Sequence, residues 1–203
     1  MNHSNDPKQE AAPTNPRPAN PQPTNPQLVK RSRFLSLVLR HEPARIGLTL
    51  DPAGWTDVEA LLDALAAHGR PLSRAQLDQV VAENDKQRFA FDPGGTRIRA
   101  NQGHSVQVDL GLPEAEPPRV LFHGTHPGAL AAIRREGLRP MRRHDVHLSA
   151  DRETAARVGA RRGRAVVLTV DAARMAAAGH RFRVSGNGVW LAATVPPEYL
   201  GGC

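Results

Sequence analysis

Two histidines, each beside small or hydroxyl residues, stand out in the second half of the chain. They occur in His123-Gly124-Thr125 and in His147-Leu148-Ser149, and Arg142-Arg143 lies between the two motifs. Glycine lets a ligand approach the backbone, histidine and hydroxyl groups can bond ribose, and arginine can hold phosphate. These groups suit a dinucleotide. Two histidines that only end core strands would give the same pattern, and spacing alone leaves both interpretations open.

The elements that position these motifs follow from the surrounding sequence. A buried strand over residues 120–122 is expected to stop at the first motif, and a helix with Pro127 in its first turn should end at Gly137. A second short strand is expected over residues 146–149. The remaining expected elements are a helix capped by Ser149, a strand over 165–170, a helix capped by Asp171, and strands over 181–184 and 189–191. This half is predicted to be α+β, and it has no GxGxxG fingerprint of a Rossmann site.

The first half begins with a predicted helix over residues 30–41, whose apolar face carries Phe34, Leu37 and Val38. Arg40 and His41 close this helix. Cations at a helix C-terminus complement the helix dipole, so the residues alone favour a simple capping role for both.

Further helices are expected to begin after the capping residues Asp57 and Ser73, and a hairpin should join residues 89–91 to 98–100. A short strand over 48–50 and a core position for Trp55 are also predicted. Three helices followed by a hairpin is the plan of a winged helix, which often binds nucleic acid, although a fold alone does not settle function.

Composition limits the classes of partner and compartment. The 203-residue chain has a formal net charge of +7, and 24 of its 27 basic residues are arginine. Arginine is the better bidentate phosphate ligand, which favours a nucleic-acid or nucleotide partner. A GC-rich genome would also enrich arginine. Cys203 is the only cysteine, and no signal peptide or membrane-length apolar run is present, so we expect a cytoplasmic protein without disulfides.

The ends of the predicted domains follow from proline and charge. Residues 1–28 hold seven of the 18 prolines and almost no apolar residues, so a disordered proline-rich tail is expected there. A proline-containing linker over 110–118 would separate an N-terminal domain over 29–109 from a C-terminal domain over 119–203.

Ten motifs distributed along the chain resemble the RNA 2′-phosphotransferase family, which includes NAD-dependent tRNA 2′-phosphotransferases. In the first half they are Phe34 to His41 (FLSLVLRH), Ile46 to Asp51 (IGLTLD), Gly54-Trp55, Asn84 to Phe89 (NDKQRF) and Ile98 to Ser105 (IRANQGHS). In the second half they are His123-Gly124-Thr125, Gly137-Leu138, Met141-Arg142-Arg143, Val146 to Ser149 (VHLS) and Asn187 to Leu191 (NGVWL). The resemblance covers roughly residues 30–200 in family order. One departure is Asp145, where the family usually has histidine, and this carboxylate could weaken phosphate binding or pair with Arg142.

The resemblance implies a winged-helix RNA lobe joined to an ADP-ribosyltransferase-like NAD lobe. It also implies that an internal 2′-phosphate of RNA attacks the nicotinamide ribose of NAD, and that the ADP-ribosylated RNA then yields ADP-ribose 1″,2″-cyclic phosphate. By resemblance, the catalytic residues are Arg40, His41, Arg88 and Arg143. The residues expected to bind NAD are His123, Gly124, Thr125, His147, Ser149 and Asn187. We expect a monomer that acts on RNA with NAD as co-substrate and without metal.

Two other functions stay open at this stage. An ADP-ribosyltransferase could modify another acceptor, such as a terminal nucleic-acid phosphate or a protein side chain. Many protein-modifying relatives use a glutamate to activate the acceptor, and the Asn187–Leu191 segment contains none. A non-catalytic winged-helix binder of RNA or DNA is the other alternative, and the complete arginine–histidine set disfavours it.

Overall fold

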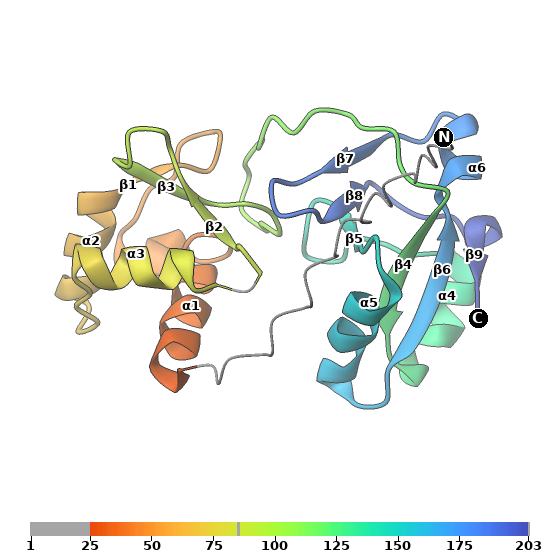
Figure 1. The fold of residues 1–203 in the computed structure, drawn as a ribbon, viewed down its shortest axis with the longest axis horizontal. Helices are drawn as coiled ribbons and strands as arrows, with labels where there is room; N and C mark the ends of the chain where they lie inside the picture. Colours follow the sequence, from red (N-terminus) through yellow and green to blue (C-terminus); the bar gives the residue numbers. More distant parts are fainter. Residues whose placement is uncertain (1–24, 85, 203) are drawn as a thin grey trace, which may run out of the picture.

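The computed structural model describes residues 25–84 and 86–202, without the side chain of Arg162, and has α+β architecture. Figure 1 shows two lobes side by side, which we call the N-terminal lobe (residues 25–100) and the C-terminal lobe (residues 120–202), joined by a connecting segment (residues 101–119). The two lobes have separate hydrophobic cores, one between Leu35 and Ala100 and one between Leu121 and Val195. The exact domain ends stay a prediction.

The N-terminal lobe packs three α-helices against a small antiparallel sheet with strand order β1-β3-β2. Its elements are α1 (Pro26–Val38), η1 (Pro43–Ile46), β1 (Thr56–Asp57), α2 (Val58–Ala67), α3 (Arg74–Ala82), β2 (Phe89–Phe91) and β3 (Arg97–Ala100). The predicted caps are confirmed: Asp57 accepts backbone N–H bonds at the start of α2, and Ser73 forms a capping box with Gln76 at the start of α3. The predicted hairpin is confirmed by the pairing of β2 with β3.

Helix α1 lies earlier in the chain than predicted. Asn25 is its N-cap and accepts a bond from the Gln27 backbone N–H at 2.9 Å, and Pro26 occupies the first turn. Residues 26–28 are therefore helical and not part of a disordered tail, while the rest of that predicted tail lies outside the described residues. The helix ends at Val38, so Arg40 and His41 lie in the turn that follows it.

Two smaller predictions in this lobe are wrong. Residues 48–50 form no strand. Trp55 is only partly buried, because its ring lies beneath the guanidinium groups of Arg97 and Arg99, at 5.5 and 4.5 Å from the ring centroid. The ring therefore packs against two arginine side chains and not within the hydrophobic core.

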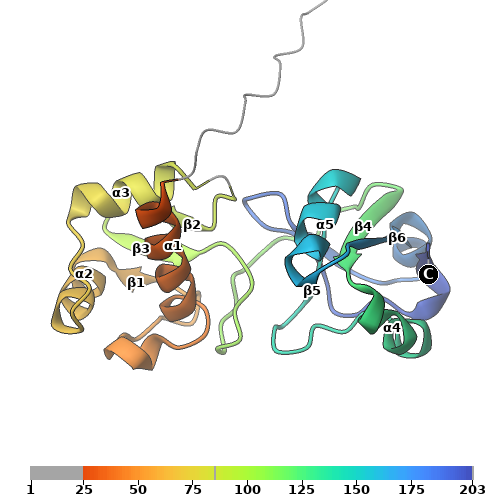
Figure 2. The ribbon, with the colours of Figure 1, turned by 90° about the horizontal axis from the view of Figure 1, so that it is seen from below.

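The C-terminal lobe contains two antiparallel sheets, with strand orders β4-β6-β9 and β5-β8-β7. Its elements are β4 (Val120–Thr125), η2 (Pro127–Ala129), α4 (Leu130–Glu136), β5 (Val146–Leu148), α5 (Arg152–Gly159), η3 (Ala160–Arg162), β6 (Val166–Asp171), α6 (Ala172–Ala177), β7 (Phe182–Val184), β8 (Trp190–Ala192), η4 (Pro197–Tyr199) and β9 (Leu200–Gly201). Figure 2 shows α5 and α4 on opposite sides of the β4–β6 pair. No described helix is long and apolar enough to cross a membrane.

Two boundaries in this lobe differ from the sequence-based expectation. Strand β4 continues through His123-Gly124-Thr125, because β6 pairs with it as far as Thr125 opposite Val166. Helix α5 is capped by Asp151, whose carboxylate accepts from the Thr154 N–H at 2.7 Å, and not by Ser149. Ser149 instead exchanges backbone hydrogen bonds with Phe122, which ties the end of β5 to β4.

The connecting segment is fastened to the C-terminal lobe along β7. The Ala115 N–H donates to the Phe182 carbonyl at 2.9 Å, and Glu114 pairs with Arg181 at 2.6 Å. A linker was expected over residues 110–118. Within it, Glu114 and Ala115 lie along β7 at the edge of the β5-β8-β7 sheet.

Candidate active site at the meeting of the two lobes

A cleft of about 940 Å³ runs along α1 and contains three of the four predicted catalytic residues, Arg40, His41 and Arg88. We call it the α1 cleft. Its walls come from one face of α1, from four residues between α3 and β2, and from Arg161 of the C-terminal lobe. The four residues are Glu83, Asn84, Lys86 and Arg88. Arginine and lysine side chains outnumber carboxylates in this lining, so the cleft suits an anion.

Arg40 is the buried cation of this group. Only 8% of its surface is exposed, and its Nη2 donates to the backbone carbonyl of Arg88 at 3.3 Å. Burial, together with the positive charges of Arg88 and Arg143, lowers the pKa of Arg40 to about 10. The guanidinium therefore remains charged at neutral pH, at an energetic cost that an anionic ligand would relieve.

Arg88 is oriented by a short chain of side chains. Its Nη1 donates to the Asn84 side-chain carbonyl at 2.8 Å, and the Asn84 amide in turn donates to Ser32 Oγ at 3.0 Å. Ser32 lies on α1 and both Ser32 and Asn84 are buried. This chain fixes the direction of the Arg88 fork relative to α1.

His41 is held by the connecting segment. Its Nδ1 is hydrogen-bonded with Ser105 Oγ at 2.9 Å, and the Ser105 N–H donates to the Arg40 carbonyl at 2.9 Å. Partial burial and then the nearby positive charges of Arg40 and Arg143 lower the pKa of His41 below 6.5. A neutral imidazole at pH 7 can accept a proton from a substrate hydroxyl.

Gly103, in the connecting segment, marks the point where the two lobes meet. A Cβ on this residue would lie 3.6 Å from His147 Nε2 and 3.7 Å from Arg40 Nη1. The same Cβ would lie 3.9 Å from Arg143 Nε. Arg143 of the C-terminal lobe thus joins the N-terminal cations, and desolvation and the nearby Arg161 lower its pKa. The structure brings the four predicted catalytic residues together.

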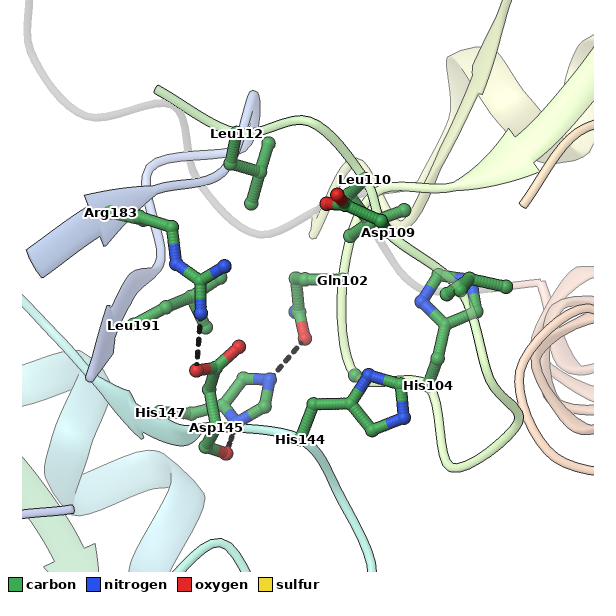
Figure 3. Close-up of a pocket in the computed structure, with 12 residues that line it drawn as sticks. Gln102, His104, Asp109, Leu110, Leu112, His144, Asp145, His147, Arg183 and Leu191 are labelled. Atoms are coloured by element: carbon green, nitrogen blue, oxygen red, sulfur yellow. Dashed lines mark hydrogen bonds and ion pairs between the residues drawn. The ribbon is translucent and has the colours of Figure 1, made fainter. Parts of the chain in front are cut away.

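The two predicted histidines lie on neighbouring strands and both are neutral at pH 7. The Nδ1–H of His123 donates to the His147 carbonyl at 3.1 Å, and burial lowers the pKa of His123 below 6.5. The pKa of His147 falls to about 3, because the ring is desolvated and lies near Arg143 and Arg40. His147 Nε2 is also hydrogen-bonded with the Gln102 side-chain oxygen Oε1 at 2.6 Å, so it links the C-terminal lobe to the connecting segment (Figure 3).

Asp145, the departure from the family pattern, pairs with Arg183 and not with Arg142. Arg183 Nη2 lies 2.7 Å from Asp145 Oδ1, and the carboxylate is mostly buried. Figure 3 shows this pair at one wall of a pocket of about 100 Å³ that also includes His147. Because its charge is paired with Arg183, Asp145 should compete less than a free carboxylate would for the arginines that are predicted to bind phosphate.

The remaining predicted NAD-binding residues have mixed surroundings. A Cβ on Gly124 would collide with the Ala155 carbonyl of α5, so glycine is needed there for helix–strand packing. Thr125 is buried at the end of β4. Asn187, in the turn between β7 and β8, donates to the Lys86 carbonyl at 2.7 Å and so contacts the N-terminal lobe. Their roles in binding NAD stay predictions.

Several site residues were not singled out from the sequence: Asn84, Gln102, Gly103, Ser105 and Arg161. Four of them lie inside the quoted motifs, but nothing local indicates that they contact the other lobe or the catalytic side chains. Arg161 lies outside every motif. Within the described ranges, no group of three or more His, Cys, Asp or Glu side chains is placed to hold a metal ion, and a metal-free reaction stays a prediction.

Comparison with known proteins identifies the family of the chain. The family model described as RNA 2′-phosphotransferase, Tpt1 / KptA family, matches residues 26–194. A probable RNA 2′-phosphotransferase of Streptomyces griseus is 64% identical over 179 residues, covering 85% of this chain and 95% of its own. A protein of the same name from Herpetosiphon aurantiacus is 56% identical over 173 residues, covering 85% of this chain and 95% of its own.

The matched range spans both lobes and includes the four predicted catalytic residues, Arg40, His41, Arg88 and Arg143. The chain belongs to the RNA 2′-phosphotransferase family, as its motifs predicted.

Proposed function

We propose that the protein is an NAD-dependent RNA 2′-phosphotransferase that removes an internal 2′-phosphate from RNA. The observation that carries this proposal is the meeting of Arg40 and Arg88 from one lobe with Arg143 from the other, next to a neutral histidine pair. The helix order and hairpin of the N-terminal lobe support a winged-helix RNA lobe. The paired small sheets of the C-terminal lobe support an ADP-ribosyltransferase-like fold.

The 2′-phosphate of RNA would be bound by the three arginines. Guanidinium groups form charge-assisted, often bidentate, hydrogen bonds with phosphate oxygens. Arg40 and Arg88 are already oriented by the Arg88 carbonyl and by Asn84. Side chains that are already oriented lose little conformational entropy when the phosphate binds. Such positioning of the reacting groups accelerates a reaction.

NAD would be bound by the C-terminal lobe, and the groups present there fit it. His123 and His147 are neutral and can bond ribose hydroxyls, and Thr125 and Ser149 add hydroxyl groups at the ends of β4 and β5. Arg143 supplies charge for phosphate. NAD as co-substrate provides an electrophilic ribose carbon and nicotinamide as a leaving group.

In the first step, a 2′-phosphate oxygen forms a bond to C1″ of the nicotinamide ribose, and the bond to nicotinamide breaks. The electron pair leaves with nicotinamide, which departs neutral. Because the phosphate is already an anion, this step requires no base. The arginines hold the phosphate in line and reduce its repulsion from other anionic groups.

In the second step, the ribose 2″-hydroxyl forms a bond to phosphorus, and the bond to the RNA 2′-oxygen breaks. The hydroxyl loses a proton, and the RNA 2′-oxygen gains one as the 2′-hydroxyl is restored. His41, neutral and anchored by Ser105, is the group positioned to move this proton. Negative charge builds on the phosphorus oxygens, so the arginines stabilise this transition state more than the preceding ground state.

The test is nicotinamide release from NAD, measured with three versions of one oligoribonucleotide. They carry an internal 2′-phosphate, a 2′-hydroxyl only, or a terminal phosphate only. We expect release with the first, together with RNA that is lighter by one phosphate. Release with the terminal phosphate alone would instead support transfer of ADP-ribose to another acceptor. NAD binding without any release would contradict both reactions.

A further inference from the structure

The α1 cleft extends beyond the residues assigned to the reacting phosphate. Besides Arg40, His41 and Arg88, it is lined by Arg33 and Lys86 and by apolar residues of α1 and α3. A volume of about 940 Å³ exceeds what one phosphate group requires. The additional cations and apolar surface therefore indicate a ligand that is longer than the reacting phosphate alone.

We propose that the α1 cleft holds the RNA strand next to the reacting nucleotide, with Arg161 as the main contact to a second phosphate. This inference rests on the proposed function and extends it to the neighbouring nucleotide. Arg161 lies in η3, directly after α5, and among the described side chains it is the one from the C-terminal lobe that lines this cleft. A strand bound there would contact both lobes at once.

The surroundings of Arg161 support a phosphate ligand. Its charge contributes to lowering the pKa of Arg143, so the two cations are neighbours. Among the described residues, no carboxylate lies within ion-pair distance of either side chain. Glu83, the carboxylate that lines the cleft, accepts from Gln79 at 2.9 Å. Adjacent cations without a counter-charge repel each other, and a chain of phosphates would remove that repulsion.

Two polar atoms in the same lining also lack a partner within the described residues. They are Ser36 Oγ and Arg40 Nε, and both are buried. Ser36 precedes Arg40 by one helical turn, and both residues line the cleft. Buried polar atoms are normally hydrogen-bonded, so these two are candidates to bond a ligand.

The apolar part of the cleft indicates what kind of strand would bind. Leu28, Val29, Leu37 and Val80 line it, and none of the described residues in the lining is Phe, Tyr or Trp. Apolar side chains can cover a base without selecting one, whereas base edges are selected through hydrogen bonds. The subsite should therefore bind single-stranded RNA through its phosphates, with little dependence on sequence.

The experiment compares Arg161→Gln with Arg164→Gln, which removes an exposed arginine from the same loop that does not line the cleft. Binding is measured without NAD by fluorescence anisotropy, using a single-stranded oligoribonucleotide with one internal 2′-phosphate and a nucleoside 2′-phosphate. For Arg161→Gln we expect the oligonucleotide Kd to rise about 10-fold and the salt slope to fall by about 0.7. The nucleoside 2′-phosphate should bind as before, and Arg161→Lys should retain most of the affinity.

Several results would overturn the subsite. These are equal weakening of both ligands, an unchanged oligonucleotide Kd, the same loss in Arg164→Gln, or no binding by the unmodified protein. Thermal melting of each variant shows whether the fold is intact, and Arg161→Ala, which also removes the charge, supplies the decision if Arg161→Gln is unfolded. Because binding is measured without NAD, failure of the proposed reaction would appear separately, as absent nicotinamide release.

Discussion

The two lobes supply opposite kinds of group to one site. The N-terminal lobe contributes Arg40 and Arg88, and Arg40 keeps its charge even though it is buried, with a pKa of about 10. The C-terminal lobe contributes His123 and His147, whose pKa values burial lowers, so that both are neutral at pH 7. The C-terminal lobe also adds Arg143, whose positive charge contributes to lowering the pKa of Arg40.

This difference fits the two substrates of the proposed reaction. Charged guanidinium groups bind phosphate anions, and neutral imidazoles bond hydroxyls without repelling the arginines beside them. The same desolvation that disfavours charge on His147 leaves the arginines charged, because their normal pKa is far above neutrality. One shared environment can therefore hold an anion on one side and a sugar on the other.

The largest expected effect concerns the packing of α5 against β4, the strand that carries His123. Gly124→Ala would place a Cβ against the Ala155 carbonyl, with Gly159 N only 2.8 Å away, so α5 must shift from β4. We expect a loss of roughly 3 kcal/mol or more in the free energy of unfolding, measured by denaturant titration. Gly186→Ala is the control, because its Cβ would meet nothing within 4 Å. Equal stability of the two variants would contradict the packing role of Gly124.

The next effect tests whether the buried histidines are neutral. His104 and His147 have folded-state pKa values of about 4 and about 3, below the ordinary 6.5, because burial disfavours their charged forms. The unfolded chain takes up these protons first, so stability should be full above pH 6.5 and fall as pH decreases toward 4. Each of the two histidines should cost roughly 3 kcal/mol between pH 7 and pH 4, measured by denaturant titration.

Replacement of His104 should remove part of that slope. His104 is 3% exposed, and neither ring nitrogen has a partner among the described residues. His104→Gln should therefore give a flatter stability curve between pH 6.5 and 4. An identical slope in the variant would show that other groups cause the acid sensitivity.

A third prediction addresses the junction between the lobes. Gly103 has φ of +87°, so Gly103→Ala should cost about 1–3 kcal/mol of stability through backbone strain. Its Cβ would also enter the space between Arg40, His147 and Arg143. Gly111→Ala has a similar strain, with φ of +61°, but its Cβ meets nothing within 4 Å. Both variants should lose stability, and only Gly103→Ala should lose turnover; equal turnover would contradict the shared site.

The smallest effect concerns the start of α1, the helix that precedes Arg40 in the chain. Asn25→Ala removes the N-cap bond to Gln27 and should destabilise the protein by about 1 kcal/mol. Asn25→Asp preserves the acceptor and should be neutral within about 0.5 kcal/mol. Thermal melts compare the two variants. If Asn25→Ala melts like the unmodified protein, the helix does not depend on this cap.

The sequence was most informative where structure is local. Asp57, Ser73 and Asp171 were recognised as helix caps because a cap bonds backbone only a few residues away. Asn25-Pro26 was misassigned to the tail because it repeats the Asn-Pro pairs at 15–16 and 20–21, although the same pair is also a cap followed by a first-turn proline.

Long-range packing accounts for what the sequence did not predict. The need for glycine at position 124 comes from α5, about thirty residues later in the chain, and a glycine beside a histidine gives no sign of it. The bond of Gln102 to His147 joins the connecting segment to the C-terminal lobe, the bond of Asn187 to Lys86 joins the two lobes, and no local pattern marks such contacts. Arg40, His41, Arg88 and Arg143 were predicted through family resemblance and not through spacing.

The measurement that tests the shared site most directly is the time course of labelled 2′-phosphorylated RNA with NAD and Arg143→Ala on denaturing gels. Loss of this arginine should slow the second step by roughly 2–4 kcal/mol and the first step by less, because charge builds on phosphorus only in the second. A slower, NAD-dependent band of ADP-ribosylated RNA should then accumulate, while Arg142→Ala, an exposed neighbour, should show none. If both steps slow equally and no such band forms at any time, Arg143 does not act on the phosphate that Arg40 and Arg88 hold.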